Sequence, residues 1–311
     1  AEYRRLKEDE DGANVWIASL EVSGESPWYN NQAYVDTLNP EATRRFIEVT
    51  HEQYAREFEE DFGGVIPSIF TDEPQFVRKS TLKRAEDRSP VVLPYTDQFE
   101  DGFIQEYGSS FLDHLPEVIW ELPDGSASAV RYHYHDYVAE LFARAYTDTI
   151  GSWCEQHHIN LTGHMMEEQT LHSQTSSISE AMRHYRSFQT PGIDILCDQR
   201  EYSTAKQAQS AVHQKGGKEM TSELYGVTNW DFDFRGHKLQ GDWQAALGVT
   251  HRVHHLSWVS MEGEAKRDYP ASISYQSPWF REYRQIEDYF GRINVALTDG
   301  QPLVRVGVIH P

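Results

Sequence analysis

A short apolar run that stops at two acids and a proline limits what this chain can fold into. Residues 65–71 read Val-Ile-Pro-Ser-Ile-Phe-Thr and lead directly into Asp72, Glu73 and Pro74. Short β-branched and aromatic runs are typical of buried parallel strands, and a proline ends the strand because it has no N–H for the ladder. In a (β/α)8 barrel, carboxylates at this end of a strand lie on the catalytic face. The alternative is an acidic loop that only terminates the strand.

Strand-like and helix-like stretches alternate along the chain. Six strands are predicted, at residues 14–22, 65–71, 159–166, 193–197, 218–222 and 252–258. The first helix has the clearest start, since Asn39 is a typical N-cap, Pro40 suits the first helical position and Glu41 lies in the first turn. This alternation favours a parallel sheet with helices outside it. We therefore expect an α/β fold of the TIM-type (β/α)8 class over residues 1–300, an incomplete barrel that lacks its first two strands.

Two stretches interrupt the rhythm. Residues 75–130 contain Pro90, Pro94 and a short helical piece, which indicates an insertion on the loop side, where barrels carry their sites. Residues 301–311 begin a new strand-like pattern and are interpreted as the start of a following domain. Because both ends fall in mid-pattern, we expect a fragment of a longer chain whose other domains are its partners, and localisation is left open.

Composition argues against several classes of function. The 311 residues carry 49 acidic against 28 basic side chains, a formal net charge of −21, which disfavours nucleic acid and anionic membranes as partners. No apolar run in the sequence is long enough to cross a membrane, and two cysteines, Cys154 and Cys197, imply no disulfide framework or zinc site. Dinucleotide, P-loop, serine hydrolase and zincin motifs are absent from the sequence. A neutral substrate such as a carbohydrate fits this charge.

If the first two strands of the barrel precede this chain, residues 65–71 form the fourth strand and residues 218–222 form the seventh. This layout resembles a large clan of retaining glycoside hydrolases on (β/α)8 barrels. Their acid/base is a Glu in an Asn-Glu-Pro-like motif after the fourth strand, and their nucleophile is a Glu at the end of the seventh. The resemblance implies Glu73 as acid/base and Glu223 as nucleophile. Asp72 departs from the pattern by replacing Asn, and an ionised Asp cannot donate a hydrogen bond to the sugar.

Three stretches also resemble large bacterial enzymes related to the β-galactosidases of glycoside hydrolase family 42 and the α-L-rhamnosidases of family 106. The first stretch runs from residues 38–42 to residues 70–74, and the second is residues 112–116. The third runs from residues 230–231 to residues 241–244. The resemblance implies a hydrolase that cleaves a glycosidic bond in an oligo- or polysaccharide, with a retaining mechanism favoured. An inverting, metal-assisted α-L-rhamnosidase and a non-catalytic carbohydrate-binding barrel are the alternatives.

Further side chains are expected around the two carboxyls. Glu167 and Glu168 follow the fifth strand and are the candidate water-activating base of an inverting enzyme. With Asp198 and Glu201 they could bind calcium through oxygen ligands, although the favoured mechanism needs no cofactor. Substrate contacts are expected from Asp72, His164, Tyr225, Trp230, His254, Trp258 and Trp28. We predict that Glu73, Glu223, His164 and Trp258 line one cavity; salt-bridged acids, core histidines and packed aromatics are the structural alternatives.

Overall fold

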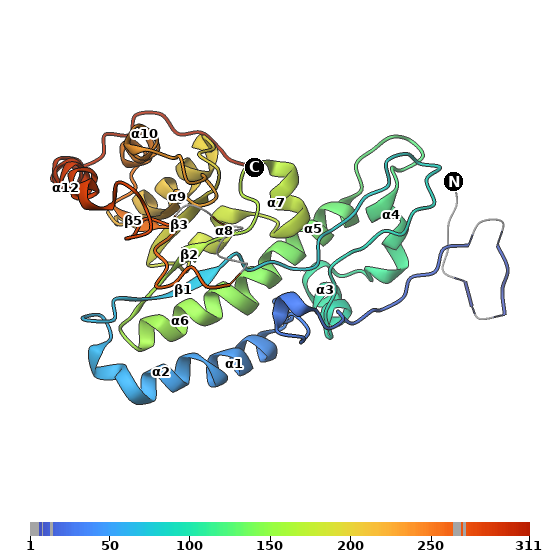
Figure 1. Ribbon diagram of the computed structural model, residues 1–311. Coiled ribbons are helices and arrows are strands. Elements are labelled where there is room, and N and C mark those ends of the chain that lie inside the picture. Colours follow the sequence, from blue (N-terminus) through green and yellow to red (C-terminus); the bar gives the residue numbers. More distant parts are fainter. Residues whose placement is uncertain (1–5, 8, 13–14, 264–268, 270–271) are drawn as a thin grey trace.

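The computed structural model describes residues 6–7, 9–12, 15–263, 269 and 272–311. Its strands are β1 (Ser68–Asp72), β2 (Asn160–His164), β3 (Thr190–Ile195), β4 (Thr221–Leu224) and β5 (His251–His254). They are all parallel, pair in sequence order in one five-stranded sheet, and curl into a half-barrel (Figure 1). Each connection between consecutive strands runs through helices, as a parallel sheet requires.

The prediction of a TIM-type (β/α)8 barrel with six of its strands in this chain is wrong, because the described residues form a five-stranded half-barrel. Of the strand predicted at residues 14–22, residue 14 lies outside the described residues and residues 15–22 form no strand. Ile17 and Val22 are 88% and 91% exposed. The segment has the residue types of a strand, but a strand forms only where a neighbour accepts its hydrogen bonds and a packed layer covers its apolar face. The other five predicted strands are present with shifted ends.

Helices cover the outer face of the sheet (Figure 1). The helices that precede β1 in the sequence are α1 (Pro40–Val49), α2 (His51–Phe58) and the 3₁₀ turn η2 (Glu59–Asp61). A continuous helical stretch before β2 consists of α5 (Ala129–Phe142), the π-helical segment η4 (Ala143–Asp148) and α6 (Thr149–Gln156). The helices that follow β2 are α7 (Leu171–Ser177), α8 (Ala181–Tyr185), α9 (Tyr202–Gln214), α10 (Phe234–Ala246), η5 (Phe280–Glu282) and α12 (Arg284–Thr298). No helix in the described part of the chain is long and apolar enough to cross a membrane.

The start of α1 confirms the helix signal in the sequence. The side-chain oxygen of Asn39 accepts the backbone N–H of Glu41 at 2.9 Å, and Pro40 occupies the first helical position. This cap satisfies one of the N–H groups that a helix start leaves without a partner. Helix α1 then packs on η4 and α6, and Glu52 of α2 accepts a hydrogen bond from Trp153 of α6, which places both helices outside the sheet.

A helical lobe interrupts the alternation between β1 and α5. Residues 73–98 run without helix or strand, and α3 (Phe99–Tyr107), η3 (Leu112–His114) and α4 (Leu115–Ile119) follow. Buried aromatic rings attach the lobe to α5, since the ring of Phe99 lies 5.8 Å from Tyr134 and 5.0 Å from Tyr137. The lobe occupies the side of the molecule away from β5 (Figure 1). Its limits as an insertion, and a separate domain from residue 301, stay predictions.

The sheet is strongly curled at β3. Outward-facing Leu161 and Ile193 are fully buried under the helices. On the concave side, the hydroxyl oxygens of Thr162 and Thr221 lie 3.1 Å apart, although β3 runs between β2 and β4. Gly192 of β3 allows this approach, because a Cβ at that position would lie 2.2 Å from the hydroxyl of Thr221. Side chains of β2 and β4 therefore converge over β3.

Candidate active site

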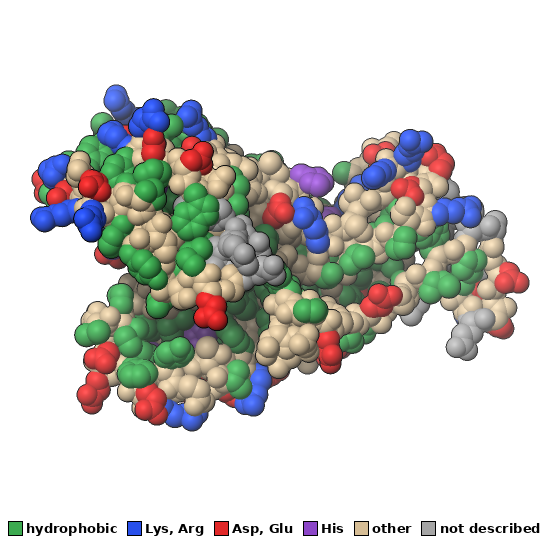
Figure 2. Space-filling model, in the orientation of Figure 1, with side chains coloured by type: hydrophobic (Ala, Val, Ile, Leu, Met, Phe, Trp, Pro, Cys, Tyr) green, Lys and Arg blue, Asp and Glu red, His purple; other side chains and the backbone are tan. Residues whose placement is uncertain are grey.

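Four neighbouring strands carry ionisable side chains to their carboxyl ends on the concave side. Asp72 and Glu73 lie at the end of β1, His164 ends β2, Asp194 lies in β3 and Glu223 in β4. The molecular surface is hollowed between the part that carries α10 and α12 and the part that carries α1 and α2 (Figure 2). Hydrophobic side chains and a histidine line this hollow. Ligand sites of parallel α/β sheets lie at this end of the strands.

His164 joins the carboxyls of this cluster. Its side chain is 2% exposed, and its Nε2 lies 3.3 Å from Glu223 Oε2 and 3.8 Å from Asp72 Oδ1. Burial opposes a charge on the imidazole, but the hydrogen bond to Glu223 and the negative charges of Asp194 and Glu168 outweigh it and raise the pKa of His164 to about 9. At neutral pH an imidazolium therefore balances part of the negative charge.

The surroundings of Glu73 and Glu223 push their pKa values in opposite directions. Burial raises the pKa of Glu73, His164 opposes the rise, and the charges of Asp72 and Glu223 add to it. Burial acts in the same direction on Glu223, but the hydrogen bond and charge of His164, together with the charge of His255, outweigh it and lower the pKa of Glu223. The Nε2 of His255 lies 3.8 Å from Glu223 Oε1. One carboxyl thus holds its proton more tightly, and the other releases it more readily.

Glu73 is fixed by its backbone as well as by its charges. Its φ is 43°, in the left-handed region that a residue with a Cβ seldom adopts. Its backbone N–H donates to the carbonyl of His164 at 3.2 Å, which extends the β1–β2 ladder by one bond. Strain of this kind costs on the order of 1–3 kcal/mol and is characteristic of functional sites. The turn therefore sets Glu73 at the mouth of the half-barrel.

Asp194 belongs to this cluster and was missed by the sequence analysis. It is in register with Glu223 on the next strand. Burial raises its pKa to about 7, with His164 opposing and Glu223 and Glu73 adding to the rise. Its Oδ1 is buried with no hydrogen-bond partner among the described residues. The sequence signal was a lone acid between two apolar residues, which strand alternation places on the opposite face from both neighbours.

Glu73, His164 and Asp194 form the one group of three potential metal ligands among the described residues, with ligand atoms within 4.8 Å of one another. An imidazole with two carboxylates suits zinc or another transition metal better than calcium, which prefers oxygen ligands. Metal binding also requires a neutral imidazole, whereas the surrounding carboxyls favour the imidazolium. The residues therefore fit calcium poorly, and no catalytic step is assigned to a metal. The ligand atoms of the four predicted calcium ligands do not form such a group. These residues are Glu167, Glu168, Asp198 and Glu201.

The two candidate alternative bases have other partners. Glu167 lies after β2, and its Oε1 is 3.1 Å from Arg78 Nη1. Glu168 is 3% exposed, and its Oε1 accepts the N–H of Met165 at 3.0 Å and lies 3.2 Å from the hydroxyl of Tyr185. These contacts use one carboxylate in an ion pair and bury the other against the helices.

Two predicted substrate contacts lie away from the cluster. Tyr225 is 1% exposed, and its hydroxyl contacts the carbonyl of His237 on α10. His254 Nε2 lies 2.9 Å from Oε1 of Glu287 on α12. Val253 is the residue in register with Glu223, so His254 points to the opposite, helix-covered face of the sheet. The structure therefore does not bring Tyr225 and His254 to the cluster.

The predicted tryptophan contacts differ in exposure. Trp258, after β5, is 9% exposed, and its ring lies 6.0 Å from Trp230, which follows β4. Trp28 lies in the 3₁₀ turn η1 (Pro27–Tyr29) and is 80% exposed. Of the four residues predicted to line one cavity, the structure brings Glu73, Glu223 and His164 together, and the place of Trp258 in it stays a prediction.

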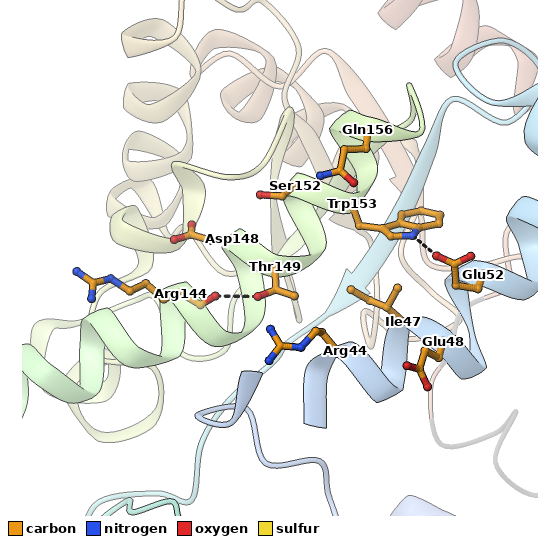
Figure 3. Close-up of a pocket in the computed structure, with 10 residues that line it drawn as sticks. All are labelled: Arg44, Ile47, Glu48, Glu52, Arg144, Asp148, Thr149, Ser152, Trp153 and Gln156. Atoms are coloured by element: carbon orange, nitrogen blue, oxygen red, sulfur yellow. Dashed lines mark hydrogen bonds between the residues drawn. The ribbon is translucent and has the colours of Figure 1, made fainter. Parts of the chain in front are cut away.

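A separate open groove lies on the outside of the helical layer, between α1–α2 and the stretch from η4 to α6 (Figure 3). Its floor includes Trp153, whose Nε1 donates to Glu52 Oε1 at 2.7 Å. None of the site residues predicted from the sequence lines it, and its charges are mixed. The lining residues are Arg44, Ile47, Glu48, Glu52, Arg144, Asp148, Thr149, Ser152, Trp153 and Gln156.

The solved structures that this chain matches include a rhamnosidase, which it covers only in part. This chain shares its fold with a rhamnosidase. The TM-score to the rhamnosidase from Novosphingobium sp. PP1Y is 0.65 at 17% sequence identity, and the match covers 87% of this chain and 26% of that protein. No protein-family model matches the sequence, and no curated protein matches it. The chain therefore spans 26% of the length of this relative, and the likeness concerns the fold.

Proposed function

We propose that this chain carries the site of a glycoside hydrolase, with Glu73 as general acid and Glu223 as the ionised carboxylate. The opposite pKa shifts of these two carboxyls, at the carboxyl ends of β1 and β4 of one parallel sheet, support the proposal. Hydrolysis of a glycosidic bond requires such a pair: a protonated carboxyl that donates to the leaving oxygen, and an ionised carboxyl on the other side of the anomeric carbon.

A retaining reaction is the route we propose. Glu73 donates its proton to the glycosidic oxygen while the bond to the anomeric carbon breaks, and Glu223 attacks that carbon to form a covalent intermediate. Glu73, now a carboxylate, takes a proton from a water molecule that hydrolyses the intermediate. His164 positions Glu223 and keeps it ionised until it attacks.

Glu223 is a better second carboxyl than Glu167 or Glu168. Glu167 is paired with Arg78, and Glu168 is buried against Met165 and Tyr185. Glu223 is partly exposed, with 20% of its side chain accessible, and lies in the cluster that includes Glu73. Of these three acids, Glu223 is the one whose ionised form is stabilised by the hydrogen bond and charge of His164.

A rhamnoside is the substrate class that we favour, cleaved by the retaining route and not by the inverting, metal-assisted route of the rhamnosidase alternative. The support is the shared fold with a rhamnosidase and the resemblance of three sequence stretches to enzymes related to family 42 β-galactosidases and family 106 α-L-rhamnosidases. The formal net charge of −21 suits an uncharged sugar better than an anionic one.

The test is the hydrolysis of 4-nitrophenyl α-L-rhamnopyranoside by the full protein that contains this chain. We expect turnover by the wild type and a loss of about 10³-fold or more in kcat for Glu223→Gln, because the amide keeps the volume but cannot attack. Glu219→Gln is the matched control, since Glu219 lies in the same segment with 59% of its side chain exposed. Binding of L-rhamnose without turnover by the wild type would favour the non-catalytic alternative. Absence of both would contradict the proposal.

A further inference from the structure

A closed turn presents an exposed tryptophan near β1. Ser26 and Gln32 pair as an isolated antiparallel bridge that closes the turn. Within it, the Ser26 Oγ accepts the N–H of Trp28 at 3.2 Å, and Asn30 and Asn31 adopt left-handed φ values of 56° and 57°. Trp28 lies inside this turn with 80% of its surface exposed. The backbone that carries the indole is therefore held by local bonds.

The turn is attached to the segment that follows β1. The ring of Tyr29 lies 4.8 Å from the ring of Tyr34. Tyr34 is partly buried and lies close enough to the backbone of Gln75 and to the charge of Asp72 for both to act on the pKa of its phenol. The hydroxyl of Thr37 donates to the carbonyl of Gln75 at 2.9 Å. These contacts place the turn at the β1 side of the carboxyl cluster.

An exposed indole in a fixed turn is suited to binding a flat ring. The aromatic face offers a large apolar area, and stacking against it adds roughly 0.5–1.5 kcal/mol beyond the area buried. Because the turn is already closed, little conformational entropy is lost when a ligand is bound. By contrast, Trp258 is 9% exposed and offers little free surface.

The positions of the two carboxyls decide which part of a substrate meets Trp28. Glu73 lies on the β1 side of the cluster and Glu223 on the β4 side. The general acid protonates the oxygen of the leaving group, so the leaving group lies on the side of the acid. The turn that carries Trp28 is on that same side.

We propose that Trp28 is the stacking platform for the leaving group and that the site prefers glycosides whose leaving group contains a ring, either a second sugar or an aryl group. This inference rests on the proposed function and extends it from the bond that is cleaved to the part of the substrate beyond that bond. Trp28 acts on specificity and is not one of the groups that transfer a proton or attack.

The test compares three substrates with the same α-L-rhamnosyl group, cleaved by the full protein: the glycosyl fluoride, the 4-nitrophenyl glycoside and a rhamnosyl-glucose disaccharide. We expect Trp28→Ala to lower kcat/KM about 10-fold for a substrate with a ring in its leaving group and to leave the fluoride unchanged. Trp28→Phe should keep most of the preference. Tyr54→Ala, at a 55% exposed aromatic position on α2, is the control and should change none of the three.

Each outcome bears on a different claim. A loss for the disaccharide alone assigns the platform to a sugar, and a loss for the aryl glycoside alone assigns it to an aryl group. If Trp28→Ala lowers kcat/KM equally for all three substrates, or for none of them, Trp28 is not the platform. The proposed hydrolase activity is unaffected by that result. If the wild type cleaves none of the three, the proposed function fails and the platform fails with it. Thermal unfolding of each variant shows whether Trp28→Ala still folds.

Discussion

The Nε2 of His164 lies 3.3 Å from Oε2 of Glu223, although β3 runs between the strands that carry them. The contact depends on the strong curl of the sheet at Gly192, where β3 has no Cβ to keep β2 and β4 apart. It also lowers the pKa of Glu223 against the effect of burial. The curvature of the half-barrel and the ionisation of a candidate catalytic group are therefore linked through these two residues.

His164→Gln should move the acidic limb of the pH profile of kcat/KM to higher pH. The positive charge and hydrogen bond of His164 hold the pKa of Glu223 below its ordinary value, and a neutral amide removes the charge. Glu223 would then be protonated at a higher pH, and activity that needs its ionised form would be lost sooner on acidification. His255→Gln is the comparison, because its contact with Glu223 is 3.8 Å long and should shift the limb less. An unmoved limb in His164→Gln would separate His164 from the ionisation of Glu223.

Glu73→Gln should affect substrates according to their leaving groups. Proton donation by a positioned acid contributes about 10²–10⁴-fold, and only poor leaving groups need it. We expect a loss of that size for a rhamnosyl disaccharide and a much smaller loss for the 2,4-dinitrophenyl glycoside. The raised pKa of Glu73 also predicts that the variant loses the basic limb of its pH profile. The ratio of kcat/KM for the two substrates is the measurement, and equal losses would remove Glu73 as the acid.

Local signals in the sequence were sufficient for the carboxyl end of β1 and the start of α1. The apolar run before Asp72-Glu73-Pro74 ends as a parallel strand, although β1 is an edge strand with Phe70 46% exposed and not the buried strand that was predicted. Asn39-Pro40 caps a helix with atoms only two residues apart. The number of strands was wrong, because residues 15–22 have strand-like residue types but pair with no strand of the described structure. Strand pairing is non-local, and a single segment does not encode it.

The sequence predicted the site residues that lie at strand ends. It did not predict the positions of residues whose face of the sheet depends on the strand register. Glu73, His164 and Glu223 converge because the ends of parallel strands meet. Whether Asp194 or His254 faces the concave side depends on a one-residue register that alternates the faces. The adjacent residues Glu167 and Glu168 also differ in their surroundings. Glu167 forms an ion pair and Glu168 is buried, and the sequence alone does not tell which of the two is which.

Lys79→Met should remove part of the pH dependence of stability. Lys79 is 7% exposed, its Nζ contacts Ser179 and His135, and burial lowers its pKa from 10.5 to about 7, with Glu180 opposing. Between these two values the unfolded chain binds a proton that the folded chain does not. The free energy of unfolding therefore rises with pH from about 7 to 10.5, with a slope of up to about 1.4 kcal/mol per pH unit from this group.

Urea unfolding at pH 7.5 and pH 9.5 measures this dependence. The wild type should gain more stability than Lys79→Met between the two values, and the variant should be the more stable protein at the lower one. Lys206→Met is the control, since Lys206 is exposed on α9. Identical pH dependence in the wild type and Lys79→Met would show that Lys79 keeps its proton in the folded protein.

The first sugar released should have the same anomeric configuration as the substrate. A nucleophilic Glu223 inverts the anomeric carbon once, and water inverts it again. Such a reaction also requires carboxyls about 5–5.5 Å apart, rather than roughly 6.5–9.5 Å. Proton NMR of a digest in its first minutes, before mutarotation, records the anomer. Release of the opposite anomer would make Glu223 the base that activates a water molecule, since Glu167 and Glu168 have other partners.

The protonation of the two carboxyls is the central claim, and carbon NMR can observe it directly. In protein labelled with ¹³C at the glutamate side-chain carboxyls, Glu73→Gln and Glu223→Gln assign the two resonances by their disappearance. We predict that the carboxyl of Glu73 titrates above its ordinary value of 4.5 and that of Glu223 below it. The reverse order, or two titrations at the ordinary value, would contradict the assignment of Glu73 as acid and Glu223 as ionised partner.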